Sequence, residues 1–251
     1  MSPPPLSILD LGRSAYLPTL ELQRSLVEQR LSGRVDHDLL LLVEHEPVFT
    51  LGRGTQSSSL PLAPAELVRR GIPVVEIERG GDVTWHGPGQ LVGYPILDLA
   101  GHRQDLHWYL RTLEEALIGA LATLGLPASR EAGRTGVWIR GRKIASIGVH
   151  VRRWVTFHGF ALNVQPDLRD FDLIVPCGIE GVDMTSIARE LGLADRASAM
   201  EPESAYLGQA DLWAASRDAV ISAFAQAFDR SPRAAPADLL EIVARMEPAT
   251  G

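Results

Sequence analysis

Two side chains in this sequence are unique in type and could act together chemically. The 251 residues contain one cysteine, Cys177, and one lysine, Lys143, and every other strongly basic residue is arginine. Arginine replaces lysine readily on a solvated surface, but not where an amine must lose its proton or lie as a compact charge beside a nucleophile. The thiolate is the nucleophilic form of cysteine, and a nearby cation favours it. The two residues therefore indicate covalent catalysis through a thiol assisted by an amine.

A structural interpretation competes for each of these residues. Cysteine is most often a small buried hydrophobe, but Cys177 lies between Pro176 and Gly178, which is typical of a loop. Alternation along Lys143–Val151 places Lys143 on the same face as the apolar Ile147. Near a strand end its stem would be buried and its amine would reach solvent. The functional alternative is an amine partly removed from water.

The segment Arg79–Gln90 carries the densest pattern of glycine with polar and aromatic residues. Adjacent glycines allow a backbone to approach a ligand closely or to take a positive φ. An elaborate turn needs glycine and proline, but it does not need Arg79, Trp85 and His86 as well. No Gly-Lys-Ser/Thr sequence follows, which excludes a phosphate-binding loop of that type. We interpret the segment as part of a binding site.

The elements that position these residues are helices and strands without regular alternation, which favours an α+β fold. The clearest helix is 105–124, whose leucines recur at helical spacing. Strands are predicted at 136–140, 143–151 and 155–164, separated by short turns, as in an antiparallel meander. We expect other strands at 6–11, 39–43, 73–77 and 91–99, helices at 17–31, 64–70, 210–228 and 238–246, and a surface linker at 231–236.

The amino-acid composition and net charge indicate which classes of protein this sequence can belong to. Hydrophobic residues make up 45% and charged residues 22%, as in a soluble globular protein, and the formal net charge of −7 disfavours a general nucleic-acid binder. No apolar run is long enough to span a bilayer and no signal peptide is recognisable. We expect a cytoplasmic protein with one domain over residues 1–230 and a tail or short helix over 231–251. The histidine spacing has no metal signature, and we expect neither a metal nor a cofactor.

Four segments, in this order, resemble the octanoyl-[acyl-carrier-protein]:protein octanoyltransferases of lipoate biosynthesis. They are Arg79-Gly-Gly-Asp-Val-Thr-Trp-His-Gly-Pro-Gly-Gln-Leu-Val-Gly-Tyr-Pro95, Gly141-Arg-Lys-Ile-Ala-Ser-Ile-Gly148, His158-Gly-Phe-Ala-Leu-Asn163 and Pro176-Cys-Gly178. Leu42-Val-Glu-His-Glu-Pro-Val-Phe-Thr50 is also similar to the family's N-terminal signature. The resemblance covers roughly residues 5 to 230, and Trp85 departs from it where a tyrosine is expected.

The resemblance implies a fold, an activity and a set of site residues. The fold is that of biotin- and lipoate-protein ligases, a central mixed sheet flanked by helices plus a smaller sheet. The activity is transfer of octanoyl from acyl carrier protein to a lysine of lipoyl domains in 2-oxoacid dehydrogenases and the glycine cleavage H protein. By position, Cys177 is the acyl-thioester nucleophile and Lys143 tunes it. The residues implied to line the acyl site are Arg79, Gly80, Gly81, Asp82, Val83, Thr84, Trp85, His86, Ser146, Ile147, Gly148, Gly159, Phe160 and Ala161.

Two other functions remain as alternatives. An ATP-dependent lipoate- or biotin-type ligase of the same fold would activate a free acid as an adenylate and would need no cysteine. A non-catalytic acyl-binding protein would need neither Cys177 nor Lys143. ATP dependence of turnover distinguishes the first alternative, and the absence of any turnover distinguishes the second.

Overall fold

The computed structural model describes residues 2–175, 182–193 and 202–246 of the chain, and Cys177 therefore lies outside the described residues. Helices and strands mix along the chain without regular βαβ repetition, as an α+β fold requires. The strands are β1 Pro5–Ser14, β2 Asp38–His45, β3 Val48–Leu51, β4 Val74–Glu76, β5 Val83–His86, β6 Gln90–Ile96, β7 Ser129–Glu131, β8 Arg134–Ile139, β9 Arg142–Arg152, β10 Val155–Asn163 and β11 Ser231–Ala234. The α-helices are α1 Tyr16–Leu31, α2 Pro64–Arg69, α3 Leu106–Thr123, α4 Ile187–Glu190, α6 Pro202–Ala227 and α7 Ala237–Met246, with short 3-10 helices at Ser57–Ser59, Leu99–Gly101 and Leu168–Leu173.

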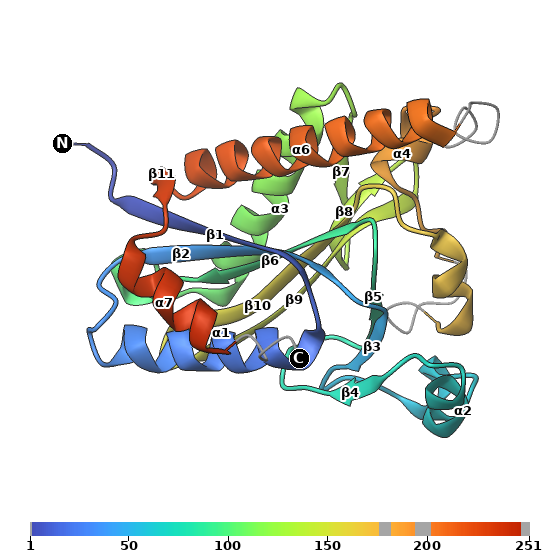
Figure 1. The fold of residues 1–251 in the computed structure, drawn as a ribbon, viewed down its shortest axis with the longest axis horizontal. Helices are drawn as coiled ribbons and strands as arrows, with labels where there is room; N and C mark the ends of the chain where they lie inside the picture. Colours follow the sequence, from blue (N-terminus) through green and yellow to red (C-terminus); the bar gives the residue numbers. More distant parts are fainter. Residues whose placement is uncertain (1, 176–181, 194–201, 247–251) are drawn as a thin grey trace.

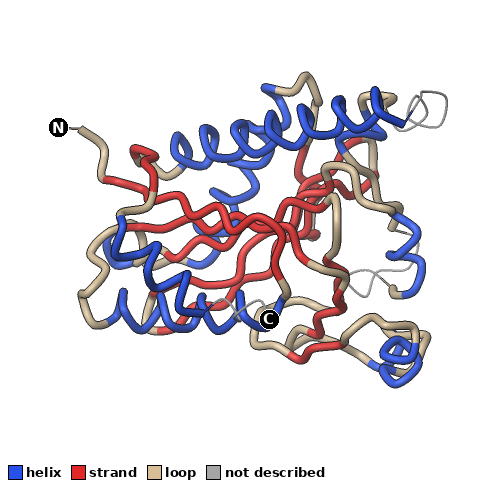
Figure 2. Tube along the Cα trace, viewed as in Figure 1, coloured by secondary structure: helices blue, strands red, loops and turns tan. Residues whose placement is uncertain are grey.

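An eight-stranded mixed sheet forms the centre of the molecule, in the order β11-β1-β2-β6-β10-β9-β8-β7. β1 pairs in parallel with β2 and β11, and the other pairs are antiparallel. The predicted meander is confirmed as β8-β9-β10. Figure 2 shows these strands as the middle layer between helices.

Helices cover both faces of the main sheet (Figure 1): α3 and α6 lie on one face, and α1 and α7 on the other. The stripe Leu113, Leu117 and Leu121 of α3 is fully buried, as its spacing predicts. Asp105 caps this helix, because its carboxylate accepts the N–H of Trp108 at 3.0 Å. Burial on both sides explains why β2 is a continuous apolar run and does not alternate with polar residues.

A second sheet, ordered β4-β3-β5, lies beside one end of the main sheet with α2 (Figure 1). It has its own apolar cluster, which includes Phe49, Leu67, Trp85 and Phe171. β5 belongs to the segment Arg79–Gln90, so part of that segment is strand and its two ends are loop.

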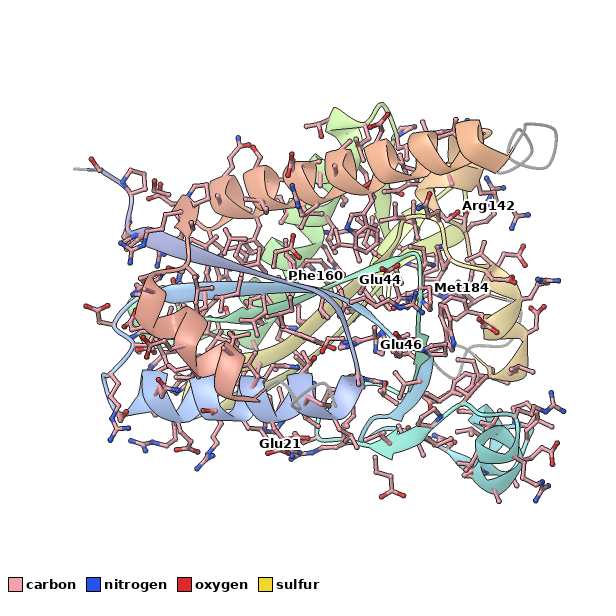
Figure 3. All side chains as sticks on the ribbon, viewed as in Figure 1. Glu21, Glu44, Glu46, Arg142, Phe160 and Met184 are labelled. Atoms are coloured by element: carbon pink, nitrogen blue, oxygen red, sulfur yellow. The ribbon has the colours of Figure 1, made fainter. Side chains whose placement is uncertain are left out.

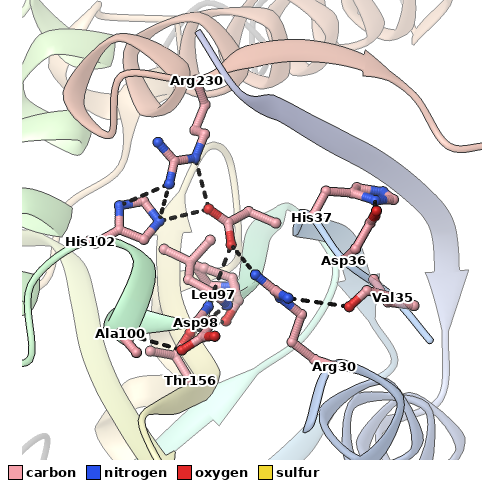
Figure 4. A network of polar contacts seen from close by, with 12 residues as sticks. Arg30, Val35, Asp36, His37, Leu97, Asp98, Ala100, His102, Thr156 and Arg230 are labelled. Atoms are coloured by element: carbon pink, nitrogen blue, oxygen red, sulfur yellow. Dashed lines mark hydrogen bonds and ion pairs between the residues drawn. The ribbon is translucent and has the colours of Figure 1, made fainter. Parts of the chain in front are cut away.

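The surface linker predicted for 231–236 is wrong, because Ser231–Ala234 form the edge strand β11 paired with β1. The turn that leads into it is held by a buried polar network around Asp38 (Figure 4). Asp38 accepts hydrogen bonds from His102 at 2.6 Å and from Arg230 at 2.8 Å. Burial alone would raise the pKa of Asp38, but these two hydrogen bonds outweigh it and hold the pKa below its usual range. An ionised Asp38 therefore fastens the start of the C-terminal segment to β2.

Candidate active site

A cavity of about 200 Å³ lies between the two sheets, and most of the residues implied by the sequence line it. It is walled by β5 from the small sheet, by β9 and β10 from the main sheet, and by the loop before β5. The implied residues that line it are Lys143, Arg79, Gly81, Asp82, Val83, Thr84, His86, Ser146, Ile147, Gly148, Gly159, Phe160 and Ala161. Residues of the segments 79–86 and 143–161, which are far apart in the sequence, thus meet around one cavity.

Two implied residues, Gly80 and Trp85, are not in this lining. Alternation along β5 turns Thr84 and His86 toward the cavity, while Trp85 packs edge-on against Phe171 in the small-sheet cluster with ring centroids 5.4 Å apart. The N–H of Gly80 donates to the carbonyl of Val149 at 2.9 Å. Gly80 and Trp85 therefore lie outside the cavity lining and stabilise the segments that form it.

Arg79 organises the glycine loop. Its buried guanidinium donates to the carbonyl of Thr50 at 2.8 Å and to that of Asp82 at 2.7 Å, closing the loop onto β3. A Cβ on Gly148 would lie 2.9 Å from both the Arg79 side chain and the Gly80 carbonyl. The close approach that Gly148 permits is therefore to the protein's own loop, which crosses β9 at this residue.

Lys143 points to the face opposite the one that alternation predicts. Val137 of β8 pairs with Ala145 of β9, but the next residue, Trp138, pairs with Lys143, so β9 carries a bulge at Ile144. Ile144 and Ala145 both enter the core beneath α3, and Lys143 is turned to the other side. The sequence-based interpretation of Lys143 as sharing a face with Ile147 is wrong because two-residue alternation fails across a bulge.

The amine of Lys143 is enclosed by protein. Its residue is only 2% exposed, which contradicts the structural alternative of an amine that reaches solvent at the strand end and agrees with the alternative of an amine removed from water. Nζ lies 5.4 Å from the centre of the Trp138 ring, a distance at which the ring face attracts a cation. The stem passes over Gly136, and the backbone N–H donates to the carbonyl of Asp183 at 2.8 Å. The segment that follows Cys177 in sequence thus returns to run alongside Lys143.

Sequence reasoning missed Tyr16, Val92, Tyr94, the turn 133–135 and His158, which also line the cavity. His158 belongs to one of the motifs, and its backbone takes a φ of +54°, a conformation that is rare for a residue other than glycine. The tyrosines come from α1 and β6, and their part in the cavity is set by packing between distant elements. No local pattern marked either of them as a site residue.

The imidazole and phenol groups beside the cavity are polar but uncharged. Burial lowers the pKa of His86 to about 3 and that of the neighbouring His45 to about 4. The Nδ1–H of His45 donates to the Ser14 carbonyl, and its Nε2 accepts from the Tyr94 hydroxyl at 2.8 Å. Burial also raises the pKa of the Tyr16 hydroxyl well above its usual range. Near neutral pH these groups are neutral, so an apolar acyl chain can lie against them without removing a charged group from water. Within residues 2–175, 182–193 and 202–246, no group of three or more His, Cys, Asp or Glu side chains could hold a metal ion.

Comparison with known proteins agrees with this architecture. Residues 15–209 match the lipoyl protein ligase A/B catalytic domain. An octanoyltransferase of Gloeobacter violaceus is 56% identical over 172 residues, which cover 68% of this chain and 75% of that protein. An octanoyltransferase of Geobacter sulfurreducens is 54% identical over 189 residues, 75% of this chain and 77% of that protein. The chain belongs to the lipoyl protein ligase A/B family, among its octanoyltransferases.

Solved structures of this family share the fold at much lower identity. A lipoate-protein ligase A crystallised with ATP superposes with a TM-score of 0.66 and 17% identity, over 98% of this chain and 94% of that one. The ligase of a bi-partite lipoylation system from Thermoplasma acidophilum gives 0.67 and 16%, over 98% and 92%. The expected fold, a large mixed sheet with flanking helices and a small second sheet, is therefore confirmed. No helix among the described residues is long and apolar enough to cross a membrane.

In this family member, Gly136 provides the space that the Lys143 side chain occupies, which gives a first prediction. A Cβ at Gly136 would lie 2.8 Å from Cε of Lys143 and 2.7 Å from the carbonyl oxygen of Ala145, and the φ of +128° is strained for any other residue. If Lys143 is catalytic, as the sequence predicts, we expect Gly136→Ala to lower kcat by about tenfold or more, because a shift of about 1 Å in a catalytic group is enough to do so. Steady-state acyl transfer measures the effect.

Gly141→Ala in the β8–β9 turn is the matched control. Gly141 also has a positive φ, +77°, but nothing lies within 4 Å of an added Cβ. Gly141→Ala should lose about 1–2 kcal/mol of stability from backbone strain. Gly136→Ala should lose more, because of the clash with the Ala145 carbonyl, and it alone should lose activity. Equal activity in the two variants would contradict the role of Gly136.

Proposed function

We propose that the protein transfers an octanoyl group from octanoyl-acyl carrier protein to a lysine of lipoyl domains through a thioester on Cys177. The acceptors are the lipoyl domains of 2-oxoacid dehydrogenases and the glycine cleavage H protein, and the reaction is a step of protein lipoylation. The observation that carries the proposal is the position of the single lysine, buried in the wall of a cavity whose lining also includes the neutral side chains of His86 and Tyr16. The high identity to octanoyltransferases supports it.

The proposed chemistry is two acyl transfers. The Cys177 thiolate attacks the thioester carbonyl of the donor, a new S–C bond forms, and the donor's C–S bond breaks. The carrier leaves as a thiolate that takes a proton from the Lys143 ammonium, which leaves Lys143 neutral for the second transfer. The ε-amine of the acceptor lysine then attacks the Cys177 thioester, an amide forms, and Cys177 is released. Exchange between thioesters is nearly balanced in free energy, so no ATP is consumed.

The residues that line the cavity have the following parts in this scheme. Lys143 stabilises the thiolate of Cys177 and later takes a proton from the incoming amine, which must be neutral to attack. The acyl chain lies along β9 and β10, against Ser146, Ile147 and Gly159–Ala161, under the loop closed by Arg79. The neutral state of His86 supports this assignment, because a charged imidazole would have to be desolvated by the chain.

Mass spectrometry with defined substrates tests the proposal. The protein is incubated with octanoyl-acyl carrier protein and then with an apo lipoyl domain, with and without ATP. Octanoylation of the lipoyl domain in the absence of ATP is the expected result. Modification that requires ATP and free octanoate would favour the ligase alternative, to which the shared fold also belongs. Binding without turnover would favour the non-catalytic alternative.

The structure changes a prediction about docking of the acidic carrier protein. In the sequence, Arg140, Arg142, Arg152 and Arg153 occupy the turns on either side of the strand that carries Lys143, which predicts one basic patch around that strand. These residues lie at opposite ends of β9, whose eleven residues span roughly 35 Å at about 3.3 Å each. Arg142, labelled in Figure 3, lies beside α4 and pairs with Glu190 at 2.8 Å. Arg152 pairs with Glu28 instead.

Arg140→Glu should therefore raise KM for the carrier protein about three- to tenfold at low salt, because a repulsive charge would lie near the Lys143 end. Arg153→Glu is the matched control. Both arginines are exposed turn residues with nearly the same backbone, φ 51° and 49°, but Arg153 is at the far end of β9. Measurement of KM for the carrier protein at several salt concentrations distinguishes the two variants. An equal rise in KM for both variants would reject docking at the Lys143 end.

A further inference from the structure

A chain of buried hydrogen bonds links the cavity to the backbone beside Lys143. Asn163 Nδ2 donates to the carbonyl oxygen of Thr185 at 3.0 Å, and Gln90 Nε2 donates to Asn163 Oδ1, also at 3.0 Å. Gln90 Oε1 lies 2.7 Å from Nδ1 of His86. Gln90 and Asn163 are each 1% exposed and neither lines the cavity. They have no place in the acyl-transfer chemistry described above.

The donor and the acceptor of each hydrogen bond in this series follow from the final acceptor, which is the carbonyl oxygen of Thr185. A carbonyl oxygen can only accept, so the group that meets Thr185 must be the amide nitrogen of Asn163. That leaves the Asn163 oxygen to accept from Gln90, and the Gln90 oxygen to face His86. The Nδ1 of His86 must therefore carry the proton. In a neutral imidazole the other nitrogen, Nε2, is then unprotonated and can only accept a hydrogen bond.

The other end of the chain lies against the backbone of Lys143. The N–H of Thr185 donates to the carbonyl of Lys143 at 2.9 Å, and the N–H of Lys143 donates to Asp183 at 2.8 Å. Thr185 thus accepts from Asn163 and donates to Lys143. A change in the hydrogen bonding of Gln90 acts both on the tautomer of His86 and on the segment that pairs with the lysine.

We propose that Gln90 and Asn163 are positioning residues, which hold His86 as the Nδ1–H tautomer and fasten it to the backbone that pairs with Lys143. The kinetic consequence rests on the proposed octanoyl transfer, but the tautomer does not. The groups around His86 keep it neutral: burial acts first, then the nearby His45, and Arg79 acts in the same direction, so the pKa of His86 falls to about 3. A ligand in the cavity therefore meets an imidazole that neither carries charge nor changes its tautomer with pH near neutrality.

The test is ¹⁵N NMR of the histidine rings combined with steady-state transfer. The seven histidines are labelled, and His86 is assigned by the loss of its signals in His86→Gln. Wild-type protein should show His86 as the Nδ1–H tautomer across neutral pH. Gln90→Leu removes the acceptor, so both tautomers should appear, and kcat for octanoyl transfer should fall about tenfold or more through misplacement of His86 and Lys143.

Thr156→Val is the matched control for the loss of a buried hydrogen bond. Thr156 is on β10, as Asn163 is, and is fully buried, and its hydroxyl donates to Pro95 and accepts from Leu97 away from the cavity. This variant should lose stability but keep the His86 tautomer and kcat. If Gln90→Leu does not fold, Gln90→Glu gives a second measurement: its carboxylate still accepts from Nδ1, and its charge should raise the pKa of His86 into the range that NMR can follow.

Three results would overturn the proposal. The first is an Nε2–H tautomer in wild-type protein, and the second is a folded Gln90→Leu that loses no more activity than an equally destabilised Thr156→Val. The third, where Gln90→Leu does not fold, is a Gln90→Glu that leaves the titration of His86 unchanged. Absence of octanoyl transfer in wild-type protein would instead reject the proposed function, and the tautomer would still be measurable.

Discussion

Wild-type protein incubated with octanoyl-acyl carrier protein is expected to gain about 126 Da, the mass of one octanoyl group, in a form that hydroxylamine removes as it removes a thioester. Cys177→Ala is expected to gain nothing and to lose octanoyl transfer to lipoyl domains. The physical reason is that the thiolate forms the intermediate that divides one difficult transfer into two easier ones. Intact-mass measurement after a short incubation detects the intermediate directly.

The amino-acid composition simplifies the assignment of the adduct in this experiment. Cys177 is the only cysteine in the chain, so a hydroxylamine-labile adduct is assigned without mapping. Cys177→Ser is the second variant, because a serine ester would resist mild hydroxylamine and its hydroxyl is a poor nucleophile beside an amine. Near-normal transfer by Cys177→Ala would mean that another group carries the acyl chain, and the thioester mechanism would be rejected.

Lys143→Arg is expected to lose at least about a hundredfold in kcat, within the range that a general acid–base group contributes. Arginine keeps the charge, but its guanidinium is planar, larger and protonated at all accessible pH values, so it cannot take a proton from the incoming amine. The site also leaves no room for it: Lys143 is 2% exposed and its Cε lies over Gly136. Steady-state transfer, with the melting temperature measured in parallel, provides the test.

Lys143→Met is the control that separates chemistry from packing. A lysine near a strand end is expected to contribute little to the core, but the burial of Lys143 means that truncation to alanine would leave a cavity. Methionine keeps most of the stem and removes the amine, so Lys143→Met should fold and fail in transfer. Alkylation of Cys177 in this variant should need a higher pH than in wild type, because no cation favours the thiolate. A fully active Lys143→Arg would show that the single lysine is an accident of composition, and the two-residue mechanism would be abandoned.

The features that could be predicted from the amino-acid sequence are those that local patterns encode. Leucine spacing predicted α3 with its buried stripe, and continuous apolar residues predicted β2, because a helix and a doubly buried strand repeat every few residues along the chain. The solitary Cys177 and Lys143 and the ordered motifs pointed to an octanoyltransferase, and the relatives at 56% and 54% identity agree. The direct role of Cys177 stays a prediction, since it lies outside the described residues.

The tertiary structure alone decided which way the site residues face and what they touch. The bulge at Ile144 turns Lys143 into the cavity, and a bulge depends on how β9 pairs with β8, which no alternation within one strand contains. The edge strand β11 exists because the exposed edge of β1 pairs with it, although its own residues look like a linker. The hydrogen-bonded chain through Gln90 and Asn163 joins side chains 73 positions apart in sequence. Contacts of this kind are set by the packing of distant elements, whereas local patterns report only which face of a helix or strand prefers to be buried.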